Sequence, residues 1–486
     1  MPGRTGEPCS RRAFIKRLAA VGLGSKTGVC SLSSAGGTQG PVLPNVLFVF
    51  ADQWRAQATG YNGDPNARTP RLDEFAGRSV RFAQAVSNCP VCSPYRASLL
   101  TGQYPLTHGV FINDVPLSEN AQSIGKIFAE AGYATGWIGK WHLDGHGSRS
   151  AFIPRIRRQG FRFWKAQECT HNYNHSFYWD DDVRRQWKGY DAQAQTEAAE
   201  AFIRRCAGKR PFLLFLSWGP PHAPYHTAPG KYRARFPPEK IALRPNVPVD
   251  LRGRARKDLA GYYAHIAALD DCFGRLLDTL ENCGIAEDTL VVFTSDHGDM
   301  LGSQGAYKKQ RPWEESIRVP FLLRWPRRLG RRGRVIPMRL SSPDIFPTLC
   351  GLCGLPVPQS VEGQDLSPFI TGARRPVDNA ALIMCPAPFG QWSRRRGGKE
   401  FRGVRTARYT YVRDLHGPWL LYDNEADPYQ LNNLCDRPEA AGLRRRLDDL
   451  LVHLLERTGD EFLPGPAYIA RWGWRVNAGG TAPYRP

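Results

Sequence analysis

The chain has 486 residues, of which 42% are hydrophobic and 23% charged, proportions typical of a folded globular protein rather than a disordered one. No stretch holds the ~18 to 20 uninterrupted apolar residues of a transmembrane helix, so we expect no membrane span. The net charge of +21 favours a polyanionic partner such as a sulfated or carboxylated glycan. A solvated, arginine-rich surface is the other interpretation. Nucleic acid is excluded as a partner because no binding motif accompanies the charge.

The first 43 residues predict an export leader. Arg11 and Arg12 form a twin arginine, followed by Phe14 and a short apolar run. This segment resembles a twin-arginine signal, which would send the folded protein across a bacterial membrane. We therefore expect residues 1–43 to be a signal and linker, and the protein to be periplasmic or secreted.

Buried strands alternate with helices between residues 44 and 375. Apolar runs predict strands at residues 45–51, 133–142, 211–224 and 288–295, and helical periodicity predicts helices at residues 118–133, 191–208 and 258–283. We expect Asp258 to cap the last of these helices. The alternation predicts an α/β fold with a large mixed, mostly parallel sheet sandwiched by helices.

The pattern changes near residue 376. Two short antiparallel strand patterns and an amphipathic helix at residues 440–457 predict a smaller C-terminal α+β subdomain over residues 376–486, separate from a catalytic domain over residues 44–375. Residues 169–182, which are rich in aromatic and polar groups, predict a loop.

Polar residues follow the predicted strands at the point where each strand ends. They are Asp52, Gln53, Lys140, His142, His222, Asp296 and His297. In open α/β sheets, ligands bind outside the carboxyl ends of the strands. A single such residue is usually a turn residue or a helix cap. Four strand ends that carry oxygen ligands, cations and imidazoles together predict a shared site for an anion and a metal ion.

Cys89 and Cys92 leave three interpretations open: half of a zinc site, a redox pair, or a single functional cysteine. A structural zinc site needs a second pair, and Cys350 and Cys353 are the one candidate. A redox pair at a helix start is chemically reasonable, because the helix dipole lowers the thiol pKa. The twelve cysteines are too scattered for a disulfide scaffold, although one or two disulfides are compatible with the sequence.

The residues after Cys92 favour the third interpretation. The stretch "CSPYRASLLTG" contains C-x-P-x-R followed by Leu-Thr-Gly, with Pro94 suited to the first turn of a helix. It resembles the core motif of the type I sulfatases, in which the cysteine is oxidised to Cα-formylglycine. Further segments resemble that family in order, from "NVLFVFADQ" through "GYATGWIGKWH", "GPPHAP" and "TSDHGDMLG" to "LYDNEADPYQLNNL". The resemblance implies an alkaline-phosphatase-like fold.

The resemblance also implies a role for each site residue. Cys92 would become formylglycine through a maturation enzyme, and its hydrate would act as nucleophile. One calcium ion would be held by Asp52, Gln53, Cys92, Asp296 and His297. Lys140 and Lys309 would contact sulfate oxygens, and Arg96 would hold the hydrate and the charge beside the metal. His142 would act as the base on the hydrate and His222 as the acid for the leaving oxygen. The spacing from Gly305 favours Lys309 over Lys308 for the sulfate contact.

We therefore expect a sulfatase that acts on a sulfated carbohydrate. Two alternatives remain: a phosphonate or phosphodiester hydrolase of the same superfamily, whose members also carry a segment like "ADQW", and a non-catalytic polyanion-binding protein with an unmodified Cys92. Gln53 stands where the family often has aspartate, and Gln103 where arginine is frequent. These departures bear on substrate choice more than on chemistry.

Overall fold

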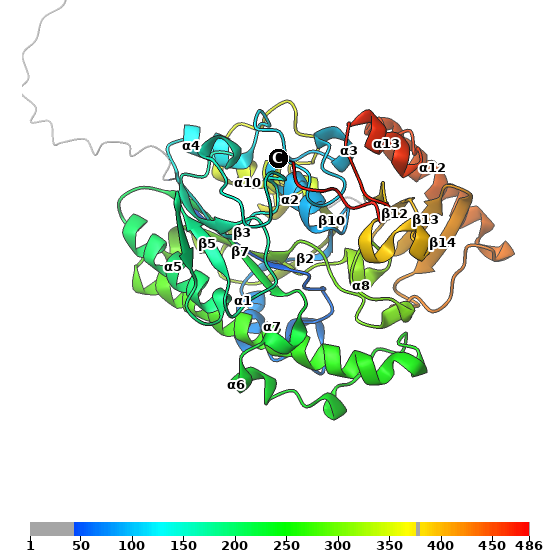
Figure 1. Cartoon of the computed structure of the whole chain (residues 1–486), viewed down its shortest axis with the longest axis horizontal. Helices are drawn as coiled ribbons and strands as arrows, with labels where there is room; N and C mark the ends of the chain where they lie inside the picture. The colour runs from blue at the N-terminus through cyan, green and yellow to red at the C-terminus, as the bar shows by residue number, and fades with distance from the viewer. Residues whose placement is uncertain (1–42, 376–379, 486) are drawn as a thin grey trace, which may run out of the picture. The chain divides into compact units, whose positions relative to one another are not determined.

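The computed structural model describes residues 43–375 and 380–485 (Figure 1). Leu43 to Pro486 form one compact unit. The predicted export signal lies outside the described residues, so both the signal and the exported location stay predictions. The predicted division between residues 375 and 376 falls beside the gap in the description and stays a prediction as well.

A ten-stranded sheet forms the centre of the fold. In spatial order its strands are β10 (Arg334–Ser341), β2 (Val80–Val86), β9 (Phe321–Arg324), β8 (Thr289–Ser295), β1 (Asn45–Asp52), β7 (Phe212–Pro221), β3 (Ala134–Lys140), β4 (Phe163–Gln167), β5 (Phe177–Asp180) and β6 (Val183–Gln186). The central strands β8, β1, β7, β3 and β4 run parallel to one another. Strand β9 pairs with β8 in the antiparallel direction. Strands β5 and β6 are antiparallel additions at one edge of the sheet. This confirms the predicted mixed, mostly parallel sheet.

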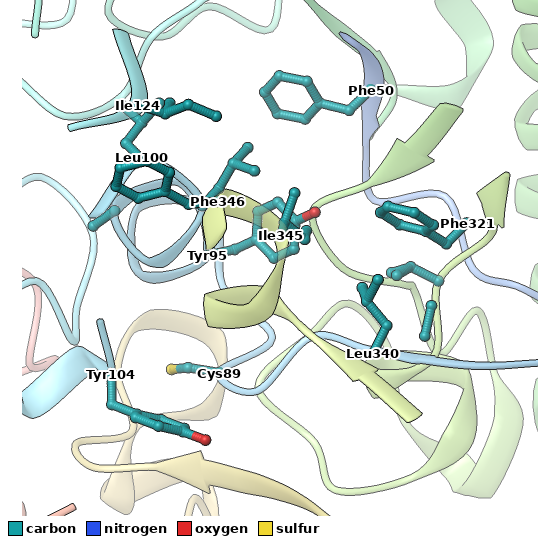
Figure 2. Packing of buried hydrophobic residues seen from close by; sticks show 14 of the residues in the cluster. Phe50, Cys89, Tyr95, Leu100, Tyr104, Ile124, Phe321, Leu340, Ile345 and Phe346 are labelled. Atoms are coloured by element: carbon teal, nitrogen blue, oxygen red, sulfur yellow. The ribbon is translucent and has the colours of Figure 1, made fainter. Parts of the chain in front are cut away.

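Strand β1 explains why a continuous apolar run marks a central strand. Its alternate residues Val46, Phe48 and Phe50 belong to one hydrophobic cluster, whereas Leu47 and Val49 belong to the other. Both faces of the strand are therefore buried. Figure 2 shows part of the first cluster, to which β1 contributes Phe50 and to which helices α2 and α10 also contribute side chains.

Helices cover both faces of the sheet (Figure 1). Those that contribute to the cluster around Leu47 include α1 (Pro70–Gly77), α5 (Asp191–Cys206) and α7 (Arg252–Asn282). Those that contribute to the cluster around Phe48 include α2 (Cys92–Thr101), α4 (Ile124–Glu130) and α10 (Ile345–Cys353). The short helices are α3 (Pro105–His108), α6 (Gly230–Arg233), α8 (Glu314–Ile317), α9 (Pro326–Leu329) and α11 (Ser367–Ile370).

Two predicted helix starts are wrong. Helix α4 begins at Ile124 because the Ser123 side chain accepts a hydrogen bond from Lys126 N and caps it. Helix α7 begins at Arg252, six residues before the predicted cap. Asp258 therefore lies inside the helix, where it pairs with Arg254 one turn earlier.

The C-terminal region forms an antiparallel sheet, as predicted, and the structure shows that it has four strands. Its strands are β11 (Ala381–Cys385), β12 (Phe401–Arg405), β13 (Tyr409–Asp414) and β14 (Gly417–Asp423), followed by α12 (Ala441–Arg457) and α13 (Gly465–Arg471). The buried pair between Arg405 and Glu314, whose Nε and Oε1 atoms lie 2.7 Å apart, ties this sheet to α8. The predicted loop at residues 169–182 is wrong in part, because β5 forms within it and pairs with β4 and β6.

Two further observations concern the cysteines and the helices of the described residues. All ten cysteines in the described residues are free thiols. No helix in the described part of the chain is both long and apolar enough to cross a membrane.

Candidate active site

The four strand ends meet, as the sequence predicts. Strands β8, β1, β7 and β3 are parallel neighbours, so their last residues lie along the same edge of the sheet. There, Lys140 Nζ from β3 lies 2.5 Å from Asp52 Oδ2 at the end of β1. His297, which follows β8, places its Nε2 3.7 Å from the other oxygen of Asp52. The geometry brings together residues far apart in the chain.

Cys92 is the first residue of α2 and faces this edge. Its Sγ lies 3.3 Å from His297 Nε2, 3.7 Å from Asp52 Oδ1 and 2.9 Å from Lys309 Nζ. Arg96, one turn along α2, donates from Nη1 to Lys140 O at 2.8 Å. The short helix thus delivers the sulfur and a guanidinium group to one place.

The surroundings activate the Cys92 thiol. Burial and the Asp52 carboxylate act to raise the pKa of Cys92, but the cations Lys140, Lys309 and His297 outweigh them and lower that pKa well below its ordinary value. A thiolate in an electropositive setting is the reactive form of cysteine. Cys92 is therefore a chemically distinctive thiol.

The structure separates the two candidate lysines. Lys309 is buried with its ammonium group at the Cys92 sulfur. Lys308 Nζ instead lies 5.2 Å from the centre of the Tyr225 ring. Lys309 is thus the residue of the pair that can contact a group bound at Cys92.

An acidic cluster beside Cys92 fits a divalent cation. Atoms of Asp52, Cys92, Asp296 and His297 all lie within 4.8 Å of one another, and within the described residues this is the one such group of three or more histidine, cysteine or acidic side chains. Burial, followed by the Asp52 charge, raises the pKa of Asp296. A cation between the two carboxylates would relieve their repulsion.

Gln53 supplies a further oxygen for that cation. Its Nε2 donates to Asp299 Oδ2 at 2.5 Å, whereas its buried Oε1 has no hydrogen-bond partner. A buried carbonyl oxygen without a partner is costly unless it binds something. Amide and carboxylate oxygens are the ligands that calcium prefers, so the donor set fits the metal that the sequence predicts.

His142 is held by a carboxylate that the sequence analysis missed. Its Nε2 lies 2.9 Å from Asp114 Oδ1, and its Nδ1 has no hydrogen-bond partner. Burial opposes protonation, but Cys169 and the bond to Asp114 prevail and raise the pKa of His142 to about 9. The backbone φ of His142 is 60°, a left-handed conformation rare outside glycine. The surroundings therefore fix both its backbone and its ring.

His222 lies at the more open side of the site. Its Nδ1 lies 2.8 Å from Ala223 O, and its ring stacks on that of His171 with centroids 4.6 Å apart. Burial and then Lys309 lower the pKa of His222 well below its ordinary value. His222 is therefore neutral in the free protein, with Nε2 free to accept a proton.

Two residues missed by the sequence analysis support the predicted ones. Asp299 orients Gln53, and its position three residues after Asp296 was a signal that could have found it. Asp114 orients His142, but nothing in the sequence links residue 114 to a histidine 28 positions away. Of the two supporting carboxylates, Asp299 could therefore have been found from the sequence and Asp114 could not.

The fold and site together define a class of enzyme: an alkaline-phosphatase-like hydrolase with a reactive cysteine at the carboxyl edge of its sheet. The Sulfatase family model matches residues 44–355, and the model of the N-sulphoglucosamine sulphohydrolase C-terminal region matches residues 302–457. The chain belongs to the sulfatase family, and the protein is a sulfuric ester hydrolase.

Three relatives illustrate the similarity. An ulvan-active sulfatase of Formosa agariphila is 43% identical over 442 residues, which cover 89% of this chain and 85% of the relative. An endo-4-O-sulfatase of Bacteroides thetaiotaomicron is 32% identical over 458 residues, 80% of this chain and 88% of the relative. A solved structure of a Bacteroides thetaiotaomicron sulfatase, from work on the metabolism of multiple glycosaminoglycans, superimposes with a TM-score of 0.79 at 30% identity, covering 88% of this chain and 99% of that one.

Proposed function

We propose that the protein removes sulfate from a sulfated polysaccharide, with Cys92 matured to formylglycine and a calcium ion at the acidic cluster. The observation that carries this proposal is the position of the Cys92 sulfur, which lies between the Lys309 ammonium group and the Asp52 carboxylate. Two of the relatives bear names that refer to ulvan and to an endo-acting 4-O-sulfatase. The net charge of +21 suits a polyanionic substrate.

Two groups would supply chemistry beyond that of the unmodified side chains. A hydrated formylglycine at residue 92 supplies a hydroxyl nucleophile, and calcium held by Asp52, Gln53, Asp296 and His297 neutralises charge on the sulfate. Gln53 Oε1 and the two carboxylates are the oxygen donors in this set, with His297 beside them.

Lys140 and Lys309 bind and orient the sulfate, and Arg96 holds the hydrate and the charge beside the metal. Lys309 lies at residue 92, and Lys140 and Arg96 both contact Asp52, with Arg96 Nη2 3.5 Å from Asp52 Oδ2. These cations are buried and fixed before substrate arrives, so they stabilise developing negative charge without reorganisation. We assign the binding of sulfate oxygens to the two lysines.

The histidines move protons at defined atoms. Because Nε2 of His142 is bound to Asp114, its Nδ1 is the atom that exchanges a proton with residue 92. His222 would protonate the leaving oxygen from Nε2, since its Nδ1 is bound to Ala223 O. An anionic sulfate would offset the lysine charges that keep His222 neutral and so favour its protonation.

Peptide mass spectrometry across residues 87–96 tests the proposal, on protein produced in a host with the maturation enzyme. We expect conversion of Cys92 to the aldehyde or its hydrate, together with hydrolysis of an aryl sulfate in preference to an aryl phosphonate ester. An unmodified thiol at Cys92 in that host would contradict the mechanism and favour a polyanion-binding role. Faster hydrolysis of the phosphonate would favour the alternative hydrolase.

A further inference from the structure

The C-terminal tail, residues 472–485, returns to the loops around the active site (its end is marked C in Figure 1). Arg485 N donates to Gly145 O at 2.8 Å, and Gly147 N donates to Arg485 O at 2.5 Å. Trp474 Nε1 donates to Gly109 O at 2.9 Å. The tail is thus fixed at both ends, although the family models that match the chain stop at residue 457.

One side chain of the tail contacts the catalytic network directly. Tyr484 Oη donates to Asp114 Oδ1 at 2.9 Å, and the same oxygen lies 2.9 Å from His142 Nε2. A single carboxylate therefore separates the tail from the histidine to which we assign proton transfer. Whatever binds beside Tyr484 lies close to the reaction centre.

A cavity of about 370 Å³ opens between the tail and Asp114. Its size is within the range of about 300–1,000 Å³ typical of small-molecule sites. Trp474, Arg475, Tyr484 and Arg485 line its tail side. The cavity thus joins a carboxylate of the reaction centre to a wall of aromatic and cationic side chains.

The cations of this cavity are available to a ligand. Both arginines are exposed, and neither forms an ion pair with any described acidic residue. The Arg485 guanidinium carbon lies 4.7 Å from the Trp474 ring centre, a cation–π contact that orders the group without using its N–H donors. Arginine offers a planar set of donors that matches a carboxylate or a sulfate.

We propose that this cavity is a second glycan subsite, which binds an anionic sugar unit adjacent to the unit that loses its sulfate. The anionic group is a carboxylate of a uronic acid or a second sulfate, held by Arg475 and by Arg485, whose guanidinium group is ordered on Trp474. The inference rests on the proposed function, because it takes the substrate to be a polyanionic glycan. In this proposal the C-terminal tail recognises the glycan beyond the sugar whose sulfate ester is cleaved.

The test compares two substrates on the Arg475→Ala/Arg485→Ala double variant. One is a sulfated oligosaccharide that contains uronic acids, and the other is a small aryl sulfate that has no second anionic group. We expect the ratio of kcat/KM for the oligosaccharide to kcat/KM for the aryl sulfate to fall about tenfold, mainly through KM. Repeating the assay with the carboxyl-reduced oligosaccharide separates the sources: a smaller fall indicates the carboxylate, and an equal fall indicates the second sulfate.

The matched control is Arg445→Ala/Arg446→Ala, which removes two exposed positive charges from α12 and should leave the ratio unchanged. An equal fall in this control would show general attraction of a polyanion and overturn the subsite. An unchanged ratio in the tail variant would also overturn it. A wild-type protein that hydrolyses neither substrate would overturn the proposed function, and this inference with it, before any variant is compared.

Discussion

Cys89 and Cys92 lie three residues apart and have opposite surroundings. Cys89 lies in the apolar cluster of Figure 2, and burial raises the pKa of its thiol to about 12. Cys92, equally buried, lies beside Lys309 and His297, and these cations and Lys140 lower the pKa of its thiol. Burial alone therefore makes a cysteine inert, and the charges delivered by distant strands make one reactive.

The largest expected effect is a loss of activity that distinguishes substitution of Cys92 from substitution of Cys89. Cys92→Ala should lower aryl sulfatase activity by about 10³-fold or more, because it removes the residue that we propose as the precursor of the nucleophile. Cys89→Ala should keep most of the activity and lower the free energy of unfolding by about 1 kcal/mol, because it leaves a small cavity. Steady-state assays and urea unfolding measure both, and comparable losses of activity in the two variants would break the comparison.

Removal of the metal ion tests the role of the Asp52 and Asp296 carboxylates beside Cys92. Dialysis against a calcium chelator should lower activity by about 10³-fold, the equivalent of several kcal/mol of charge stabilisation. It should also lower the melting temperature, since the repulsion between Asp52 and Asp296 would no longer be relieved. Calcium should restore both. Full activity and an unchanged melting temperature in protein shown by elemental analysis to be metal-free would contradict the assignment.

Substitution of the neighbouring residues Lys308 and Lys309 tests the role of the cations around Cys92. Lys309→Ala should lower kcat/KM by about 10²-fold, because it removes a fixed cation at residue 92. Lys308→Ala removes the same charge from a side chain that packs on Tyr225, and we expect a change of less than about threefold. The pair controls for net charge, and a larger loss in the Lys308 variant would reverse the assignment.

Much of the fold and the site could be predicted from the sequence, because strand ends and an ordered motif carry strong local signals. The convergence of Asp52, Lys140 and Asp296 follows from parallel strands alone. The bond between Asp114 and His142 could not be predicted, because the two residues lie 28 positions apart and no sequence pattern links them. The contact from Tyr484 to Asp114 spans 370 positions, and no local pattern reports such a distance.

The start of α7 shows another limit of local patterns. The apolar periodicity begins near Asp258, so the predicted helix began there. The preceding residues 252–257 are mainly charged residues with good helix propensity. They extend the helix toward its N-terminus beyond the part that packs on the core, where hydrophobic periodicity gives no signal.

A buried charge pair acts on the other cysteine of the comparison, Cys89. Arg402 acts to lower the pKa of Cys89, but its Nη2 is paired with Asp460 Oδ1 at 3.2 Å, inside the protein. Asp460→Asn should lower the free energy of unfolding by about 3–5 kcal/mol, because it leaves a buried guanidinium group without its partner. Glu461→Gln, which breaks the exposed pair with Arg471, should change it by less than about 1 kcal/mol.

The same pair has a defined pH dependence. Burial acts to raise the pKa of Asp460, but the Arg402 charge and hydrogen bonds outweigh it and lower that pKa below its unfolded value of about 3.9. The stability that the carboxylate contributes is therefore present above about pH 4 and is lost as the pH falls through the lower, folded-state pKa. Urea unfolding of wild type and Asp460→Asn should give curves that differ at pH 7 and converge at lower pH. A difference that stays constant with pH would show that Arg402 does not need the Asp460 charge, and that packing rather than charge matching keeps the surroundings of Cys89 inert.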